Sequence, residues 1–219
     1  MCERRLVSFG TAGARDWSDR PVAIVGGGPS LQGFDFGRLR SRFTVVAVNA
    51  SMFDLPFADA GFSIDIRAAR NWWPKIRNEV RFPFYLAIDN PVLDHFSGPP
   101  PSSVVFLRRV QGTALSTNPV LISAGGTSGF GALHLSFLKG AKRITLFGFD
   151  YQPSAVGEWH HNEQHYFPHR QRLWDWQKWA RNFDAAASVL RQAGVEVVNA
   201  SPGSAITAFR RVSIEEALA

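Results

Sequence analysis

Apolar residues along the chain gather in short runs that end in glycine or polar residues, as buried strands of a parallel sheet do. Such runs occupy residues 22–26, 44–48, 82–88, 104–107, 143–147 and 195–198, and residues 57–65 lead into another that ends at Asp65. Between several of these runs, apolar residues recur every three or four positions, as on one face of a helix. The clearest case comprises Leu173, Trp176, Ala180, Phe183, Ala187 and Leu190. This alternation predicts an α/β fold, with a mainly parallel sheet and helices on both faces.

Three further helices are expected from local signals. Phe130–Leu138 places apolar side chains on one helical face, and Lys139 and Gly140 are suited to end that helix. A helical stretch is predicted to start at Asn71, and Ser213 is expected to cap a short acidic helix near the end of the sequence.

Composition points to one ordinary folded domain. The chain has 219 residues, of which 45% are hydrophobic and 19% are charged, and we expect a lead-in over residues 1–20 and a Rossmann-like domain over residues 21–219. No apolar run is long enough to span a bilayer, and a signal peptide and disulfides are not indicated, since Cys2 is the single cysteine. A cytoplasmic location is therefore expected.

The net charge of +6 fits an anionic ligand, but the basic residues are scattered and form no block. A nucleic-acid partner is therefore disfavoured, and a solvated basic surface is the simpler interpretation. The sequence leaves the oligomeric state open, including a homo-oligomer.

A glycine-rich turn follows the first buried strand. Gly26, Gly27, Gly28, Pro29 and Ser30 stand where an α/β protein binds phosphate with backbone N–H groups. A tight structural turn is the alternative. Leu31 replaces the third glycine of the dinucleotide fingerprint, and Asn49 replaces the acid that usually binds an NAD ribose. A mononucleotide is therefore favoured over a nicotinamide cofactor.

A second anion-friendly turn precedes the helix at residue 130. Gly126, Thr127, Ser128 and Gly129 supply small side chains and two hydroxyls. Ligands of parallel sheets bind beyond the carboxyl ends of the strands, where the first turn, Asn49, Asp65, Asp150 and residues 199–204 also fall. This convergence predicts a nucleotide-binding site.

Four histidines, His160, His161, His165 and His169, lie in a polar segment (about 151–172) that we expect to act as a lid over the site. His161, His165 and His169 are spaced to share a helical face and bind a metal, although Pro168 would break that helix. Structural packing is a second alternative. The third, and the one favoured, is acid–base chemistry near neutral pH.

Tryptophans are concentrated in the long helix. The periodicity places Trp176 on its core face, which leaves Trp174 and Trp179 as candidates for stacking on a base. Packing in the core or against the lid is the favoured interpretation for all three.

In its order of motifs, the chain resembles the bacterial CMP-sialic-acid-dependent sialyltransferases of lipooligosaccharide synthesis. The motifs are the glycine turn, Asn49, Gly126–Gly129, Gly148-Phe149-Asp150 and His165-Tyr166-Phe167-Pro168-His169. The resemblance implies a Rossmann-like domain with a lid and no required metal. It also implies that Gly26–Ser30 and Asn49 contact a cytidine nucleotide, that Thr127, Ser128 and Gly129 lie near the donor, and that His169 is the general base. Two features depart from that family: Gly27 replaces an asparagine, and Gln152 and Trp159 stand near the places of the lid tyrosines.

The glycine turn, Gly126–Gly129, Gly148-Phe149-Asp150 and residues 58–65 also resemble the MptE-like group. That group is named for an archaeal 6-hydroxymethylpterin diphosphokinase and is rich in phage and bacterial members. That resemblance implies that Asp65 and Asp150 hold Mg²⁺ on a triphosphate. Capping of turns is the alternative role for both aspartates.

The function expected first is therefore a transferase, of sialyltransferase type, that moves a sugar from a nucleotide-activated donor to a glycan or small-molecule acceptor. The glycine turn, Ser128 and Asp150 would bind the nucleotide, with the phosphates on the turn and Ser128, and Asn49 would bind the ribose or base. His169, with His165, would deprotonate the acceptor hydroxyl, and Arg170 would neutralise the leaving phosphate. The alternatives are a Mg²⁺-dependent diphosphokinase and a nucleotide-binding protein without catalytic activity.

Overall fold

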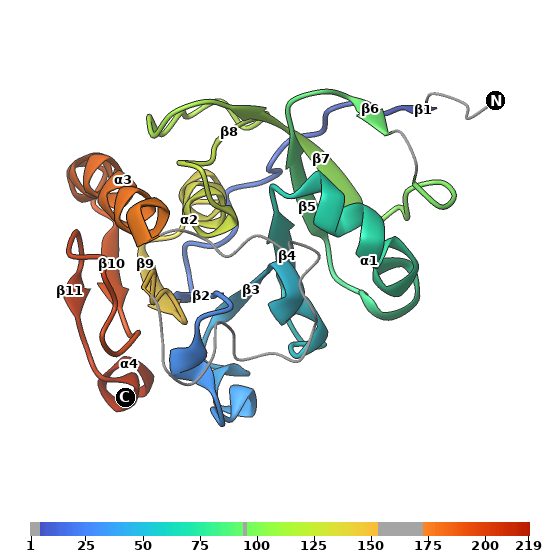
Figure 1. Cartoon of the computed structure of the whole chain (residues 1–219). Coiled ribbons are helices and arrows are strands. Elements are labelled where there is room, and N and C mark those ends of the chain that lie inside the picture. Colours follow the sequence, from blue (N-terminus) through green and yellow to red (C-terminus); the bar gives the residue numbers. More distant parts are fainter. Residues whose placement is uncertain (1–4, 94–95, 153–172) are drawn as a thin grey trace.

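A nine-stranded parallel sheet organises the computed structural model, which describes residues 5–93, 96–152 and 173–219 (Figure 1). The strand order is β11-β10-β9-β2-β3-β4-β5-β7-β8, and every neighbouring pair is parallel. The strands are β2 (Val22–Val25), β3 (Thr44–Val48), β4 (Ala60–Ser63), β5 (Phe84–Ile88), β7 (Val104–Val110), β8 (Leu121–Ser123), β9 (Arg143–Phe147), β10 (Glu196–Asn199) and β11 (Arg210–Arg211). The predicted α/β class and parallel sheet are confirmed.

Helices cover both faces of the sheet, as predicted. α1 (Ile66–Glu79) packs on one face, and α2 (Ser128–Leu138) and α3 (Leu173–Gln192) pack on the other. Side chains along each strand alternate between the two cores: Val22 and Ile24 contact the α2 side, and Ala23 and Val25 contact the α1 side. Shorter helices are η1 (Pro29–Leu31), η2 (Phe36–Leu39), η3 (Asn49–Phe53) and α4 (Ile214–Leu218).

The N-terminal segment, expected to be a loosely held lead-in, is hydrogen-bonded to the folded domain. β1 (Arg5–Leu6) pairs antiparallel with β6 (Val92–Leu93). The Gly10 N–H donates to a carbonyl within β7, the Ala12 N–H donates to a carbonyl just before β8, and Trp17 is buried. This segment therefore contributes to the packing of the domain.

The chain order creates a switch point in the middle of the sheet. From β2 the chain moves outward through β3, β4, β5, β7 and β8, and α2 then carries it back to β9, on the other side of β2. The connections after β2 and β9 leave in opposite directions, so a crevice opens beyond their carboxyl ends. This crevice is where open parallel sheets bind ligands.

Some boundaries differ from those predicted. α1 begins at Ile66, where Asp65 caps it, and not at Asn71, because the cap satisfies two N–H groups at the end of β4. β8 and β11 were not predicted, since runs of two or three residues carry too little periodicity. The turn after β2 enters a three-residue 3₁₀ helix.

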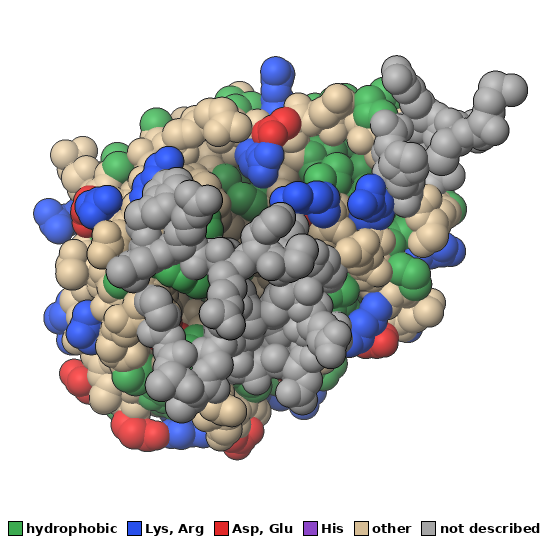
Figure 2. Space-filling model, in the orientation of Figure 1, with side chains coloured by type: hydrophobic (Ala, Val, Ile, Leu, Met, Phe, Trp, Pro, Cys, Tyr) green, Lys and Arg blue, Asp and Glu red, His purple; other side chains and the backbone are tan. Residues whose placement is uncertain are grey.

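Figure 2 shows arginine and lysine side chains dispersed over the visible face among acidic and apolar ones. Among the described residues, no helix has the length and apolarity that a membrane crossing requires.

Candidate functional site

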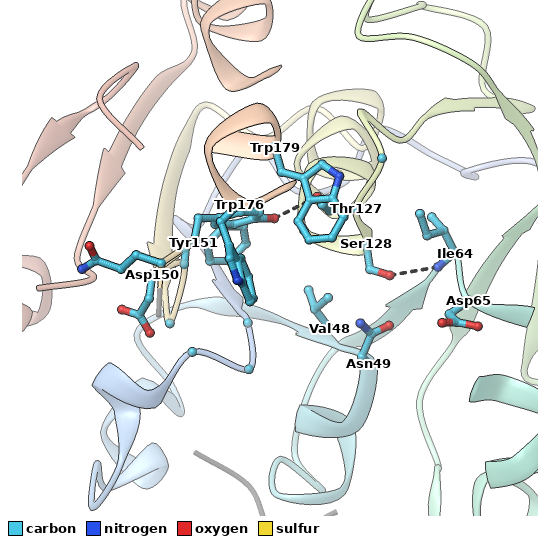
Figure 3. A pocket seen from close by; sticks show the side chains of 18 of the residues that line it. Val48, Asn49, Ile64, Asp65, Thr127, Ser128, Asp150, Tyr151, Trp176 and Trp179 are labelled. Carbon is cyan, nitrogen blue, oxygen red and sulfur yellow. Dashed lines mark hydrogen bonds between the residues drawn. The ribbon is translucent and has the colours of Figure 1, made fainter. Parts of the chain in front are cut away.

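A cavity of about 470 Å³ lies at the switch point, beyond the carboxyl ends of β2, β3, β4 and β9 (Figure 3). It is lined by residues from six separate segments: Gly26, Gly27, Gly28, Pro29, Val48, Asn49, Ile64, Asp65, Arg67, Gly126, Thr127, Ser128, Gly129, Gly148, Phe149, Asp150, Tyr151, Gln152, Trp176 and Trp179. Both anion-friendly turns, Asn49 and the two aspartates therefore share one cavity. Residues 199–204 do not line it; Ser201 instead accepts the Phe149 N–H, at 2.7 Å, and supports the β9 turn.

The glycine turn packs tightly against the turn that follows β9. The Gly26 N–H donates to the Phe147 carbonyl at 2.8 Å, and the Gly28 N–H donates to the Gly148 carbonyl at 2.9 Å. A Cβ on Gly28 would lie 2.5 Å from the Gly148 oxygen. Gly26 and Gly28 thus allow two turns of the protein to approach each other, which is the structural role given above as the alternative to contact with a ligand.

The side chain of Asp150 packs against the glycine turn. Its carboxylate is buried, and Oδ2 accepts the Ser30 N–H at 3.1 Å, at the start of η1. The carboxylate stands 1.9 Å from the position that a Gly28 Cβ would take. A phosphate placed against Gly28 and Ser30 would lie beside this carboxyl group, which already accepts the Ser30 N–H.

The N-terminus of α2 offers the opposite chemistry. Thr127 caps the helix by accepting the Phe130 N–H, at 3.2 Å, and the Ser128 hydroxyl accepts the Ile64 N–H, at 3.1 Å. In the part of the chain that the structure describes, no protein acceptor is paired with the backbone N–H groups of Ser128 and Gly129. Both residues line the cavity, so the positive end of the helix dipole is directed at it.

Tyr151 connects the turn after β9 to the N-terminus of α2. Its hydroxyl forms a hydrogen bond with Thr127 Oγ1 at 2.8 Å, and its backbone has a φ of 49°, which is strained for a residue with a side chain. Burial raises the pKa of this hydroxyl. The sequence interpretation missed Tyr151, although its place directly after the strand-end Asp150 was an available signal.

Two tryptophans of α3 form a wall of the cavity. Trp176 was predicted to face the core, but the structure places it, with Trp179, in the cavity lining. The helical periodicity was right for Ala180 and Phe183, which are buried. Trp176 lies at the edge of that face, where the β9 turn, and not the sheet, is its neighbour.

The remaining polar residues lie across the cavity from Asp150. Asn49 Oδ1 accepts the Ser63 hydroxyl at 2.8 Å, and Asp65 Oδ1 accepts the N–H groups of Arg67 and Ala68, each at 3.0 Å. Figure 3 shows Asp65 and Asp150 on opposite sides of the cavity. Asp65 has the capping role that was the alternative to metal binding, and the described residues contain no cluster of three or more histidine, cysteine or acidic side chains suited to a metal.

The predicted catalytic residues lie outside the described residues. These are His165, His169 and Arg170, and the metal alternative through His161 falls in the same segment. Of the expected lid, only Tyr151 and Gln152 are described, and the Gln152 amide donates to the Gly203 carbonyl. The roles of the histidines remain predictions.

No protein-family model matches the sequence, and no curated protein matches it. Among solved structures, the chain is similar to the MAf glycosyltransferase from Magnetospirillum magneticum AMB-1, with a TM-score of 0.57 and 16% identity. That match covers 97% of this chain and 36% of that one, so the chain spans about a third of MAf. It is also similar to the sialyltransferase CstII from Campylobacter jejuni, solved with the substrate analogue CMP-3FNeuAc, with a TM-score of 0.48, 16% identity and coverage of 89% and 86%. The match to MAf agrees with the Rossmann-like fold.

Proposed function

We propose that the protein is a glycosyltransferase that takes its sugar from a nucleotide-activated donor. The observation that carries the proposal is the cavity at the switch point, where the N-terminus of α2 faces polar groups from four strand ends. A glycosyltransferase shares the fold, which favours this class among those that Rossmann-like sheets support.

The donor phosphates bind at α2 in this proposal. The Ser128 and Gly129 N–H groups supply two donors, and the helix dipole adds about 0.3–1 kcal/mol of favourable interaction with an anion. The glycine turn is assigned no phosphate, because the Asp150 carboxylate already receives the Ser30 N–H there. This proposal differs from the sequence-based expectation that the phosphates lie on both the glycine turn and Ser128.

Asp150 is the basis for orienting the nucleotide sugar in the proposed site. A carboxylate accepts hydrogen bonds, so it suits the hydroxyls of a ribose or the amino group of a base. We therefore assign the nucleoside to the side of Asp150 and Gly27, and the transferred sugar to the side of Asn49 and Arg67. Because Asn49 Oδ1 already accepts the Ser63 hydroxyl, its amide nitrogen is the group that donates to the ligand.

In the proposed chemical step, the anomeric carbon of the sugar exchanges its bond to the donor phosphate for a bond to the acceptor. The acceptor hydroxyl oxygen attacks the anomeric carbon of the sugar, and the bond from that carbon to the phosphate oxygen breaks. His169 takes the hydroxyl proton, supported by His165, and Arg170 balances the charge of the leaving nucleotide. Proton transfer of this kind typically contributes about 10²–10⁴ in rate.

A binding screen tests the proposal first. The protein is heated with CMP, UDP, GDP, ATP and their sugar conjugates, with and without Mg²⁺. A ligand present at about 100 times its Kd should add about 2.7 kcal/mol of stability, and at least one nucleotide sugar should do so. Failure of every nucleotide to raise Tm would refute the proposal.

His169→Ala tests the base in the donor hydrolysis or transfer that the screen identifies. We expect kcat to fall by about 10²-fold or more, with donor affinity unchanged. His160→Ala, in the same segment but outside the proposed pair, serves as the matched control and should retain activity. An unchanged kcat in His169→Ala would remove His169 from the mechanism.

A further inference from the structure

We propose that Trp176 and Trp179 form a stacking subsite for the base of the bound nucleotide; this inference rests on the proposed function. Both indoles belong to the lining of the cavity, one helical turn apart on α3. Figure 3 shows their rings projecting from α3 toward the polar residues of the strand ends.

Contacts with rigid neighbours hold the two rings in place. Their centroids lie 5.7 Å apart with an interplanar angle of 84°, and Trp176 meets Tyr151 edge to face at 6.1 Å. Trp179 is fixed against the turn before α2, since its Nε1 lies 2.9 Å from where a Gly126 Cβ would be. The Asn182 amide donates to the Gly125 carbonyl at 2.7 Å and fastens α3 to that same turn.

The burial of these rings differs from that of the neighbouring aromatic residues. Phe183 is fully buried and does not line the cavity, and Phe149, which does line it, exposes almost none of its side chain. Trp176 and Trp179 are only half-buried, and they border the cavity. A flat apolar surface at a ligand cavity suits another flat ring, and base–aromatic stacking tolerates every base because each has a π-face.

The position of the wall selects the base over the sugar. Trp176 contacts Tyr151, which directly follows Asp150, and Asp150 marks the nucleoside side of the proposed site. Asn49 lies on the other side of the cavity from Asp150 (Figure 3), and its side-chain amide is a hydrogen-bonding group of the kind that a sugar needs. The wall therefore contributes affinity with little discrimination among bases, and specificity for the base comes from polar groups such as Asp150.

Binding of nucleoside monophosphates and of a base-free analogue separates this role from a general structural one. Trp176→Leu and Trp179→Leu are titrated with CMP, UMP, AMP, GMP and ribose 5-phosphate. A loss of about 1 kcal/mol in stacking converts to about a fivefold weaker Kd, so we expect each variant to bind all four nucleotides at least fivefold more weakly. The Kd of ribose 5-phosphate should stay within twofold, because this ligand has no base.

Conservative and control variants complete the experiment. Trp176→Phe and Trp179→Phe keep a ring and should restore much of the nucleotide affinity. Lys178→Leu, on the exposed side of α3 between the two tryptophans, should bind every ligand as the wild type does.

Two results would overturn the inference: nucleotide affinities that leucine leaves unchanged, or equal losses for the nucleotides and for ribose 5-phosphate. Both leave the proposed function standing, since the wild type still binds nucleotides. A wild type that binds none of the four contradicts the inference and the proposed function together.

Discussion

At the scale of one residue, Gly28 shows why the sequence of the glycine turn predicts phosphate binding. The sequence shows a strand followed by glycines, and that pattern serves equally for contact with a ligand and for contact between two turns. In the structure, the space beside Gly28 is filled by Asp150 and by the Gly148 carbonyl. The sequence could not decide between the two roles, because Asp150 is 122 residues away and only the fold brings it close.

Gly28→Ala is expected to destabilise the fold by about 1–3 kcal/mol, the usual cost of overpacking a tight site. Its Cβ would stand 1.9 Å from Asp150 Oδ2 and 2.5 Å from the Gly148 oxygen. Urea unfolding measures the loss. Adding Asp150→Ala should recover part of it, since one of the two clashing atoms is then absent; an unaffected midpoint in Gly28→Ala would show that the turns are not in contact.

His134 should make stability depend on pH. It is fully buried in α2, where Nδ1 accepts the Ser123 N–H at 2.9 Å and Nε2 lies 2.8 Å from the Ser116 carbonyl, so the ring is neutral with Nε2 protonated. Burial lowers its pKa below the ordinary value of 6.5. Below about pH 6.5, His134 is therefore protonated in the unfolded chain but stays neutral in the native state. The free energy of unfolding falls as the pH drops through this range.

His134→Gln removes the titrating group and is the control for this effect. The difference between wild type and variant should shrink as pH falls from about 7 to 5, with a slope of up to about 1.4 kcal/mol per pH unit. Urea midpoints at several pH values measure it. A difference that stays constant with pH contradicts a neutral buried imidazole.

At the scale of the element, the N-terminus of α2 carries most of the proposed chemistry. Thr127 accepts the Phe130 N–H and holds the Tyr151 hydroxyl, so one hydroxyl both caps the helix and fixes the β9 turn beside it. The position of Ser128 and Gly129 depends on both contacts. This element therefore links the stability of the helix to the geometry of the cavity.

Thr127→Ala should cost about 1 kcal/mol of stability through loss of the cap, and it should weaken nucleotide binding as well. Thr127→Ser keeps the hydroxyl and is expected to behave as the wild type in both assays. Tyr151→Phe removes the second contact alone, so it should affect binding more than unfolding. Urea unfolding and nucleotide titration of the three variants measure these effects, and binding that is unimpaired in Thr127→Ala argues against a role for the capped helix end.

Elements were predictable from the sequence to the extent that they are long and uniform. The buried strands β2, β3, β5 and β9 and the helix α2 were recognised because each is an unbroken apolar run or a clear helical face. In the site, Asn49, Ser128 and Asp150 were found because they stand at strand ends or helix starts. Tyr151 was missed, Trp176 was assigned to the core, and packing was favoured for Trp179 over stacking, because the exposure of these rings to the cavity depends on how α3 packs on the β9 turn.

At the scale of the molecule, the parallel sheet places the glycine turn and the N-terminus of α2 at one edge, and its switch point opens the cavity between them. The fold alone is compatible with many reactions. Three local features restrict which reactions the cavity suits. They are the buried carboxyl group of Asp150 beside the glycine turn, the N–H groups at the start of α2 that have no acceptor among the described residues, and the aromatic wall on α3.

The proposed transfer needs no metal, because the helix N-terminus and Arg170 supply the positive charge. We therefore expect turnover of the donor identified in the binding screen to change less than twofold when EDTA is added. Turnover measured with EDTA, and again after Mg²⁺ is restored in excess, checks this. A loss that Mg²⁺ reverses would favour the diphosphokinase alternative instead.

The central claim is that the phosphate binds at α2 and not at the glycine turn. Titration of ¹⁵N-labelled protein with inorganic pyrophosphate tests it most directly, since this probe carries no ring that could shift resonances by itself. The account predicts large, saturable shifts of the Ser128 and Gly129 amide resonances, with the Gly28 and Ser30 amides nearly unchanged. Shifts concentrated at Gly28 and Ser30, or no saturable shift at any of the four amides, would contradict it.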